Sequence, residues 1–116
     1  MKMIHISLPN HPEATLEGYI LDCEITLGQS ERRPAVLVCP GGGYRRVCNF
    51  IEGHPYAKKL NAMGYHAIVV FYRVNVLARY PAPQDDLARA VRVVHAHAEE
   101  WNLDMTGYSV WGSSAG

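Results

Sequence analysis

The last five residues of the chain have the spacing that a nucleophilic serine requires. Gly112, Ser114 and Gly116 form a G-x-S-x-G pattern that follows directly on an apolar segment at 108–111. A serine at the tip of a tight turn after a strand exposes its hydroxyl at the end of a sheet. Small flanking residues relieve the crowding in such a turn. We therefore predict that Ser114 attacks a carbonyl carbon and that the two glycines shape its turn.

Three consecutive glycines at 41–43 indicate the second part of the same chemistry. Acyl transfer places negative charge on one oxygen, and backbone N–H groups must already point at that position. The residue after the nucleophile, Ala115, supplies one donor, and a glycine loop after an earlier strand supplies another. A flexible loop or a phosphate cradle is the alternative interpretation of the glycines. Arg46 stands where G-x-G-x-x-G needs its last glycine, and no G-K-[ST] ending follows, so both phosphate-binding patterns fail.

The hydrophobic pattern predicts the elements that must position these two loops. Continuous apolar runs indicate strands buried on both faces of a sheet, and an apolar stripe with steps of three and four indicates the second helix. Strands are expected at 3–8, 16–26, 35–39, 65–72 and 108–111, helices at 54–63 and from 83 onward, and turns or loops at 9–12, 28–34 and 102–107. The first two strands are expected to pair antiparallel, and the later alternation implies parallel strands with right-handed crossovers.

The composition of the chain limits the classes of function that it can have. The 116 residues carry 11 Lys plus Arg and 11 Asp plus Glu, so the formal net charge of zero argues against nucleic acid or an anionic membrane as the main partner. No apolar run reaches the roughly 18 residues of a membrane span, and the first ten residues do not resemble a signal peptide. A cytoplasmic location is therefore expected. The three cysteines and six histidines are scattered, so the sequence predicts no metal site.

Four segments together resemble a known family. They are Cys39-Pro40-Gly41-Gly42-Gly43-Tyr44, Ala62-Met63-Gly64-Tyr65, Tyr80-Pro81-Ala82-Pro83 and Trp111-Gly112-Ser113-Ser114-Ala115-Gly116. They are similar to α/β-hydrolases of the acetyl-esterase, acetylxylan-esterase and feruloyl-esterase-like branch. Pro40 stands where related lipases have His, as it does in the acetyl-esterase-like branch. The resemblance implies a cofactor-free esterase with nucleophile Ser114, oxyanion donors Gly42, Gly43 and Ala115, and a small-molecule or carbohydrate ester as substrate.

The resemblance also implies which part of the fold residues 1–116 form. They are expected to be the N-terminal portion of a single α/β-hydrolase domain: a mostly parallel sheet flanked by helices, truncated after strand 5. The family's strand order, 1-2-4-3-5-6-7-8, would leave the fifth strand on an unpaired apolar edge, which favours aggregation.

The catalytic residues that follow the nucleophile in this family are missing from these residues. The superfamily's triad order along the chain is Ser, then Asp or Glu, then His. Asp86 and all the histidines precede Ser114, so Asp86 is interpreted as structural. The chain alone is therefore expected to be inactive and marginally stable.

Three other functions remain open from the sequence. A serine peptidase of the same fold would use the same chemistry, and a non-catalytic hydrolase-like domain would bind without reacting. A nucleotide-binding α/β domain is disfavoured because both glycine fingerprints fail.

Overall fold

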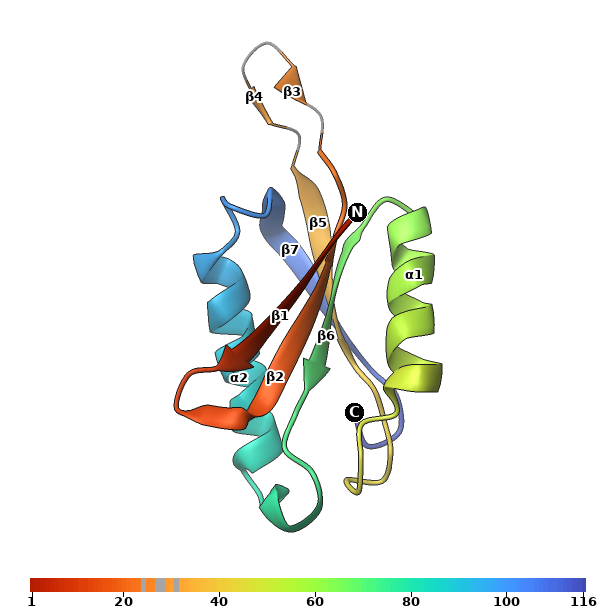
Figure 1. Ribbon diagram of the computed structural model, residues 1–116, viewed down its shortest axis with the longest axis vertical. Coiled ribbons are helices and arrows are strands. Elements are labelled where there is room, and N and C mark those ends of the chain that lie inside the picture. Colours follow the sequence, from red (N-terminus) through yellow and green to blue (C-terminus); the bar gives the residue numbers. More distant parts are fainter. Residues whose placement is uncertain (24, 27–28, 31) are drawn as a thin grey trace.

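A five-stranded sheet with helices on opposite faces forms the protein (Figure 1), in a computed structural model that describes residues 1–23, 25–26, 29–30 and 32–116. A separate pair of very short strands, β3 and β4, projects from one end of the sheet. The elements, in chain order, are β1 (Lys2–Leu8), β2 (His11–Ile20), β3 (Ile25–Thr26), β4 (Gln29–Ser30), β5 (Arg33–Cys39), the π-helical turn η1 (Asn49–Gly53), α1 (His54–Ala62), β6 (His66–Phe71), the 3-10 turn η2 (Asn75–Leu77), α2 (Ala82–Ala96) and β7 (Leu103–Gly112).

The strand order of the main sheet is β1-β2-β6-β5-β7. β1, β2 and β6 pair antiparallel, whereas β5 pairs parallel with both β6 and β7. Numbered along the chain within this sheet, the order is 1-2-4-3-5, which confirms the order expected from the family resemblance. The expected α/β class is likewise confirmed. Because β5, β6 and β7 run in one direction, their carboxyl ends share one edge of the sheet.

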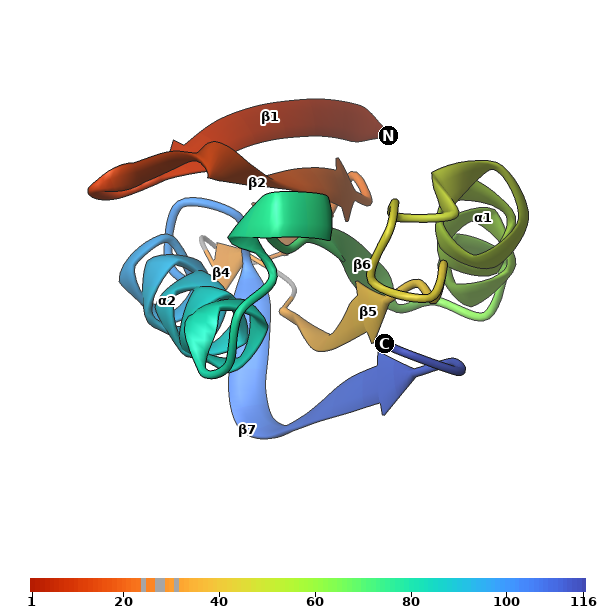
Figure 2. The same ribbon diagram turned by 90° about the horizontal axis from the view of Figure 1, so that it is seen from below.

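The core lies in two layers, one on each face of the sheet. Alternate residues of β5 separate between them: Leu37 contributes to the layer under α2, and Val36 and Val38 to the layer under α1. In α2, Ala90 and Val94 are fully buried, and Val94 belongs to the apolar stripe that predicted this helix. Figure 2 shows the same arrangement from below, with α1 and α2 on opposite sides of the sheet. The two long helices therefore cover both faces of the parallel strands.

The structure corrects the expected ends of two strands. β2 runs from His11 to Ile20 instead of 16–26, because its hairpin register pairs residue 20 with residue 2 of β1. β7 begins at Leu103, where a turn was expected, because residues 103 and 104 already pair with β5. Residues 105–108 then form a bulge, in which Gly107 has a φ of +71°. Position 24 of the expected second strand and positions 28 and 31 of the expected loop lie outside the described residues.

A buried carboxylate ties α2 to the segment that follows β6. The Asp86 side chain has no solvent exposure, and its Oδ2 accepts the backbone N–H of Arg73 at 2.7 Å. The guanidinium Nε of Arg73 donates to both carboxylate oxygens at 3.0 Å. Arg89 adds a second cation 3.5 Å from Oδ1. Asp86 therefore holds α2 against the sheet, which is the structural role expected from the sequence.

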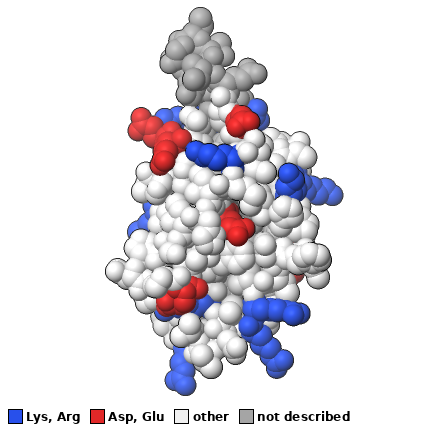
Figure 3. All heavy atoms as spheres, in the orientation of Figure 1, with Lys and Arg blue, Asp and Glu red and all other residues white. Residues whose placement is uncertain are grey.

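The surface carries interspersed charges. On the face shown in Figure 3, acidic and basic side chains are separated by wide uncharged areas, as the net charge of zero would suggest. Within the part of the chain that the structure describes, no helix combines the length and the apolar character needed to cross a membrane.

We predict that Asp86→Ala lowers the free energy of unfolding by about 3–5 kcal/mol, because it leaves the Arg73 guanidinium without its buried partner. Urea denaturation at neutral pH measures this loss. Asp85→Ala is the matched control: Asp85 is exposed in the same helical turn, so its loss should cost no more than about 1 kcal/mol. Equal losses in the two variants would contradict the role given to Asp86.

Candidate active site

The parallel pairing of β5 and β7 brings the two predicted loops together. Cys39, the last residue of β5, is in register with Gly112, the last residue of β7. The backbone N–H of Ser113 then donates to the carbonyl of Cys39 at 3.3 Å. The glycine segment and the serine turn therefore leave the sheet from neighbouring strands, at its carboxyl edge, where open α/β sheets bind ligands.

Ser114 lies at the tip of a tight turn. Its φ is +54°, its side chain is exposed, and the Gly116 N–H closes the turn on the Ser113 carbonyl at 2.8 Å. A Cβ placed on Gly116 would lie 1.9 Å from the Cys39 carbonyl oxygen, so no larger residue fits there. The turn presents the serine hydroxyl to solvent above the strand ends.

The glycine segment passes directly beside the serine. A Cβ placed on Gly41 would lie 2.9 Å from the Cβ of Ser114, which shows how closely the two backbones approach. Gly42 and Gly43 follow with φ values of +145° and +65°. Among the described residues, none accepts a hydrogen bond from the amides of Gly42, Gly43 or Ala115. These three N–H groups thus use none of their hydrogen-bonding capacity within the described part of the chain.

Hydrogen bonds from other elements fix the glycine segment. The Tyr72 hydroxyl donates to the Pro40 carbonyl in a short bond. The Gly41 N–H donates to Oε2 of Glu52 at 3.2 Å, and the Gly41 carbonyl accepts the N–H of Cys48 at 2.8 Å. The N–H of Arg45 donates to the Gly42 carbonyl at 3.2 Å. Each of the three peptide carbonyls from 40 to 42 is thus held by a donor.

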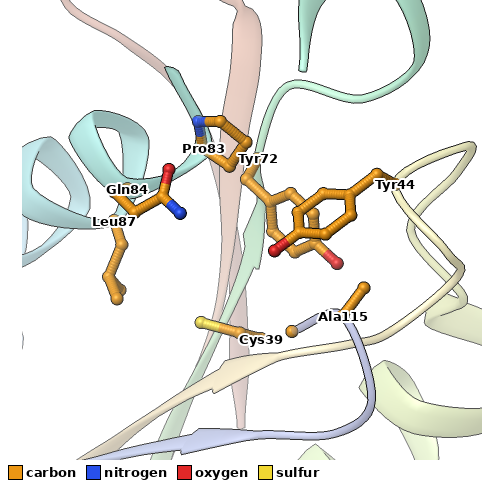
Figure 4. Close-up of a pocket in the computed structure, with 8 residues that line it drawn as sticks. Cys39, Tyr44, Tyr72, Pro83, Gln84, Leu87 and Ala115 are labelled. Carbon is orange, nitrogen blue, oxygen red and sulfur yellow. The ribbon is translucent and has the colours of Figure 1, made fainter. Parts of the chain in front are cut away.

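A small hollow of about 220 Å³ lies beside the serine turn. Its lining residues are Cys39, Tyr44, Tyr72, Pro83, Gln84, Leu87, Ala115 and Gly116. Figure 4 shows the two tyrosine rings over Ala115, with the α2 side chains facing them from across the hollow. The rings of Tyr44 and Tyr72 meet edge to face, with their centroids 6.3 Å apart. Most of these groups are apolar, so the hollow suits a small apolar group.

Comparison with known proteins assigns the family of this chain. The BD-FAE family model matches residues 21–116, which is most of the chain. The chain belongs to the BD-FAE family.

Related proteins place this BD-FAE chain among the α/β-hydrolases. Acetylxylan esterase of Xylanibacter ruminicola is 34% identical over 82 residues, covering 71% of the chain and 17% of that protein. A crystal structure of an α/β-hydrolase enzyme from a Medee basin deep-sea metagenome library matches with a TM-score of 0.90 and 32% identity, covering 100% of the chain and 48% of the other.

A third match is an acetyl ester-xyloside bifunctional hydrolase from Caldicellulosiruptor lactoaceticus. Its structure matches with a TM-score of 0.77 and 36% identity, covering 92% of the chain and 36% of the other. The chain thus spans about half the length of the metagenome enzyme and less than a fifth of the curated relatives it matches.

Two ionisable side chains of the candidate site are held in their neutral forms. Burial raises the pKa of the Cys39 thiol to about 11. Burial, together with nearby groups that include Cys39, Tyr44 and Glu52, raises the pKa of Tyr72 to about 12. At neutral pH the Tyr72 phenol therefore remains a donor to Pro40, and Cys39 acts as an apolar wall of the hollow.

The structure brings together the predicted residues Gly42, Gly43, Gly112, Ser114, Ala115 and Gly116 at one edge of the sheet. Asp86 lies apart from them, in its own cluster with Arg73. No histidine in the described part of the chain forms a hydrogen bond with Ser114. Sequence reasoning missed Glu52 and Tyr72, because neither belongs to a motif and both reach the glycine segment only through the fold.

Tyr72 gives a pH-dependent prediction with a definite sign. The pKa of the Tyr72 phenol in the folded protein lies above the ordinary value of 10. The stabilisation that the Tyr72 side chain contributes should therefore be complete below pH 10 and be lost as the pH rises through about 12. Tyr72→Phe should therefore be less stable than wild type by about 1–3 kcal/mol at neutral pH, since the Pro40 carbonyl loses its donor. Urea unfolding of both proteins from pH 7 to 11 should show this difference shrinking above pH 10.

Tyr80→Phe serves as the control, because the Tyr80 ring is 85% exposed. Its stability should follow that of wild type at every pH. If the difference in unfolding free energy between wild type and Tyr72→Phe stays constant from pH 7 to 11, the raised pKa of Tyr72 is contradicted.

Proposed function

We propose that the protein is a serine carboxylic-ester hydrolase that forms an acyl-enzyme on Ser114. The observation that carries this proposal is the close approach of the glycine segment to the serine turn, with a Gly41 Cβ position 2.9 Å from the Ser114 Cβ. Acyl transfer requires a nucleophile and, close to it, backbone N–H groups that have no other acceptor. Membership of the BD-FAE family and the esterase names of several relatives support the same reaction.

In the proposed mechanism, Oγ of Ser114 attacks the ester carbonyl carbon while a base takes its proton. The carbonyl oxygen becomes an oxyanion that accepts hydrogen bonds from Gly42, Gly43 and Ala115. Collapse of this intermediate breaks the bond to the alcohol, which leaves with a proton, and the acyl group stays on Ser114. Water then attacks the acyl-enzyme through the same steps and releases the carboxylic acid.

The base in this mechanism is a histidine oriented by an acid, as in other hydrolases of this fold. Within the 116 residues, no acid and no histidine follows Ser114, where this superfamily carries both. The chain spans about half the length of the metagenome enzyme, and we propose that the acid and the histidine belong to the part of the fold that this chain does not cover.

The proposed substrates are short-chain acyl esters, including acetyl esters on sugars. The hollow beside Ala115 measures about 220 Å³, below the usual range for drug-sized ligands, and its lining is mostly apolar. Both features favour a small acyl group over a long one. Two relatives are named for acetyl ester substrates, an acetylxylan esterase and an acetyl ester-xyloside hydrolase.

The first test uses the protein expressed from its complete reading frame. It should hydrolyse 4-nitrophenyl acetate and acetylated xylan, and Ser114→Ala should lower kcat by roughly 10⁴- to 10⁶-fold, because the nucleophile is gone. Ser7→Ala, an exposed serine of the edge strand β1, is the matched control and should keep wild-type kinetics. Cleavage of peptide anilides in preference to acetyl esters would instead show the peptidase of the same fold. Binding without any Ser114-dependent turnover would show a non-catalytic domain.

The second test uses residues 1–116 alone. We predict no difference between this chain and its Ser114→Ala variant in 4-nitrophenyl acetate hydrolysis, because a serine without its base is a weak nucleophile at neutral pH. The assay is run beside buffer and beside the full-length protein. A clear excess of the wild-type rate over the variant rate would overturn this prediction.

A further inference from the structure

Glu52 contacts the glycine segment close to the serine turn. It lies in the π-helical turn η1, is half-buried, and its Oε2 accepts the Gly41 N–H at 3.2 Å. A Cβ placed on Gly41 would lie 3.1 Å from this oxygen and 2.9 Å from the Cβ of Ser114. The carboxylate and the serine therefore flank the same glycine.

The main-chain bonds of η1 hold Glu52 in this place. The N–H of Glu52 donates to the carbonyl of Cys48 at 2.9 Å, and the N–H of Cys48 in turn donates to the Gly41 carbonyl at 2.8 Å. Within the described chain, no lysine or arginine forms an ion pair with Glu52. The contact that the carboxylate makes is thus to the glycine backbone, and a charged acceptor makes this hydrogen bond stronger than a neutral one would.

These contacts fix the direction of the amides that a substrate would meet. In a trans peptide, the carbonyl and the N–H point to opposite sides. The peptide joining Pro40 to Gly41 is held at both ends, by the Tyr72 hydroxyl at its carbonyl and by Glu52 at its N–H. The next peptide has its carbonyl held by the N–H of Cys48, so its own N–H, which belongs to Gly42, points away from Cys48.

We propose that Glu52 is a positioning residue, which sets the orientation of the oxyanion donors Gly42 and Gly43 by binding the Gly41 N–H. This proposal rests on the proposed esterase function, because it concerns the oxyanion site of that reaction. In this role Glu52 acts through the Gly41 backbone, to which it is hydrogen-bonded. The hydrogen bonds of the oxyanion site are stronger in the transition state than in the bound substrate. Loss of Glu52 should therefore lower kcat and leave KM nearly unchanged.

Three substitutions at Glu52 in the full-length protein distinguish the effect of side-chain length from the effect of charge. Glu52→Gln keeps the length and an acceptor oxygen but removes the charge. Glu52→Asp keeps the charge but is one methylene too short to meet the Gly41 N–H. Glu52→Ala removes both. Glu99→Ala is the matched control, because Glu99 is exposed at the opposite end of the sheet and should keep wild-type kinetics.

We expect the Asp and Ala variants to lose roughly 10- to 100-fold in kcat on 4-nitrophenyl acetate, with KM within about threefold of wild type. The Gln variant should retain kcat within about fivefold, since it still accepts the hydrogen bond. Urea unfolding is recorded for each variant, and if the Ala variant does not fold, the comparison of Asp with Gln decides the question.

Three results would overturn the positioning role: an unchanged kcat in the Asp variant, a rise in KM alone, or an Asp variant as active as the Gln variant. These are distinct from failure of the esterase proposal. An inactive wild type, or a Ser114→Ala variant as active as wild type, would remove both proposals. An active wild type with an inactive Ser114→Ala and a fully active Glu52→Asp would remove only this one.

Discussion

The parallel register between β5 and β7 is the constraint on which the candidate site depends. It pairs Cys39 with Gly112, and the two loops that leave these residues meet because of it. A slip of one residue would shift the serine turn by about 3.3 Å along β5 and reverse which side chains face each core layer. The separation of Leu37 from Val36 and Val38 into opposite layers resists such a slip, since the wrong register would expose buried methyl groups. Core packing thus fixes the site geometry.

Much of the fold follows from short-range patterns. The apolar run of β5 and the stripe of α2 predict the positions of these elements correctly, and the helix expected at 54–63 is observed as α1. The strand order came from the family resemblance, because pairing between distant strands leaves no local signal. The starts of β2 and β7 were misplaced for a related reason: strand ends depend on the partner's register, which the chain's own hydrophobicity does not encode.

The candidate site likewise contains residues that a sequence motif identifies and residues that only the fold brings close to it. Ser114 and the three glycines could be found from the sequence because their chemistry needs specific residue types in sequence order. Glu52 and Tyr72 could not, because the distances that matter join residues 11 and 32 positions apart. The positive φ of Ser114 costs roughly 1–3 kcal/mol for a residue other than glycine. The bonds at Ser113 and Gly116 hold the turn in that conformation.

The bulge in β7 separates two stretches of pairing with β5. One residue of β5, Ala35, stands opposite four residues of β7, 105–108, between the pair Pro34–Asp104 and the pair Val36–Ser109. Residues 105–108 have no partners in β5, so the strand pairing on either side does not fix the length of this stretch. The length of this stretch can therefore change while the last four pairs, and with them the turn that carries Ser114, stay where they are.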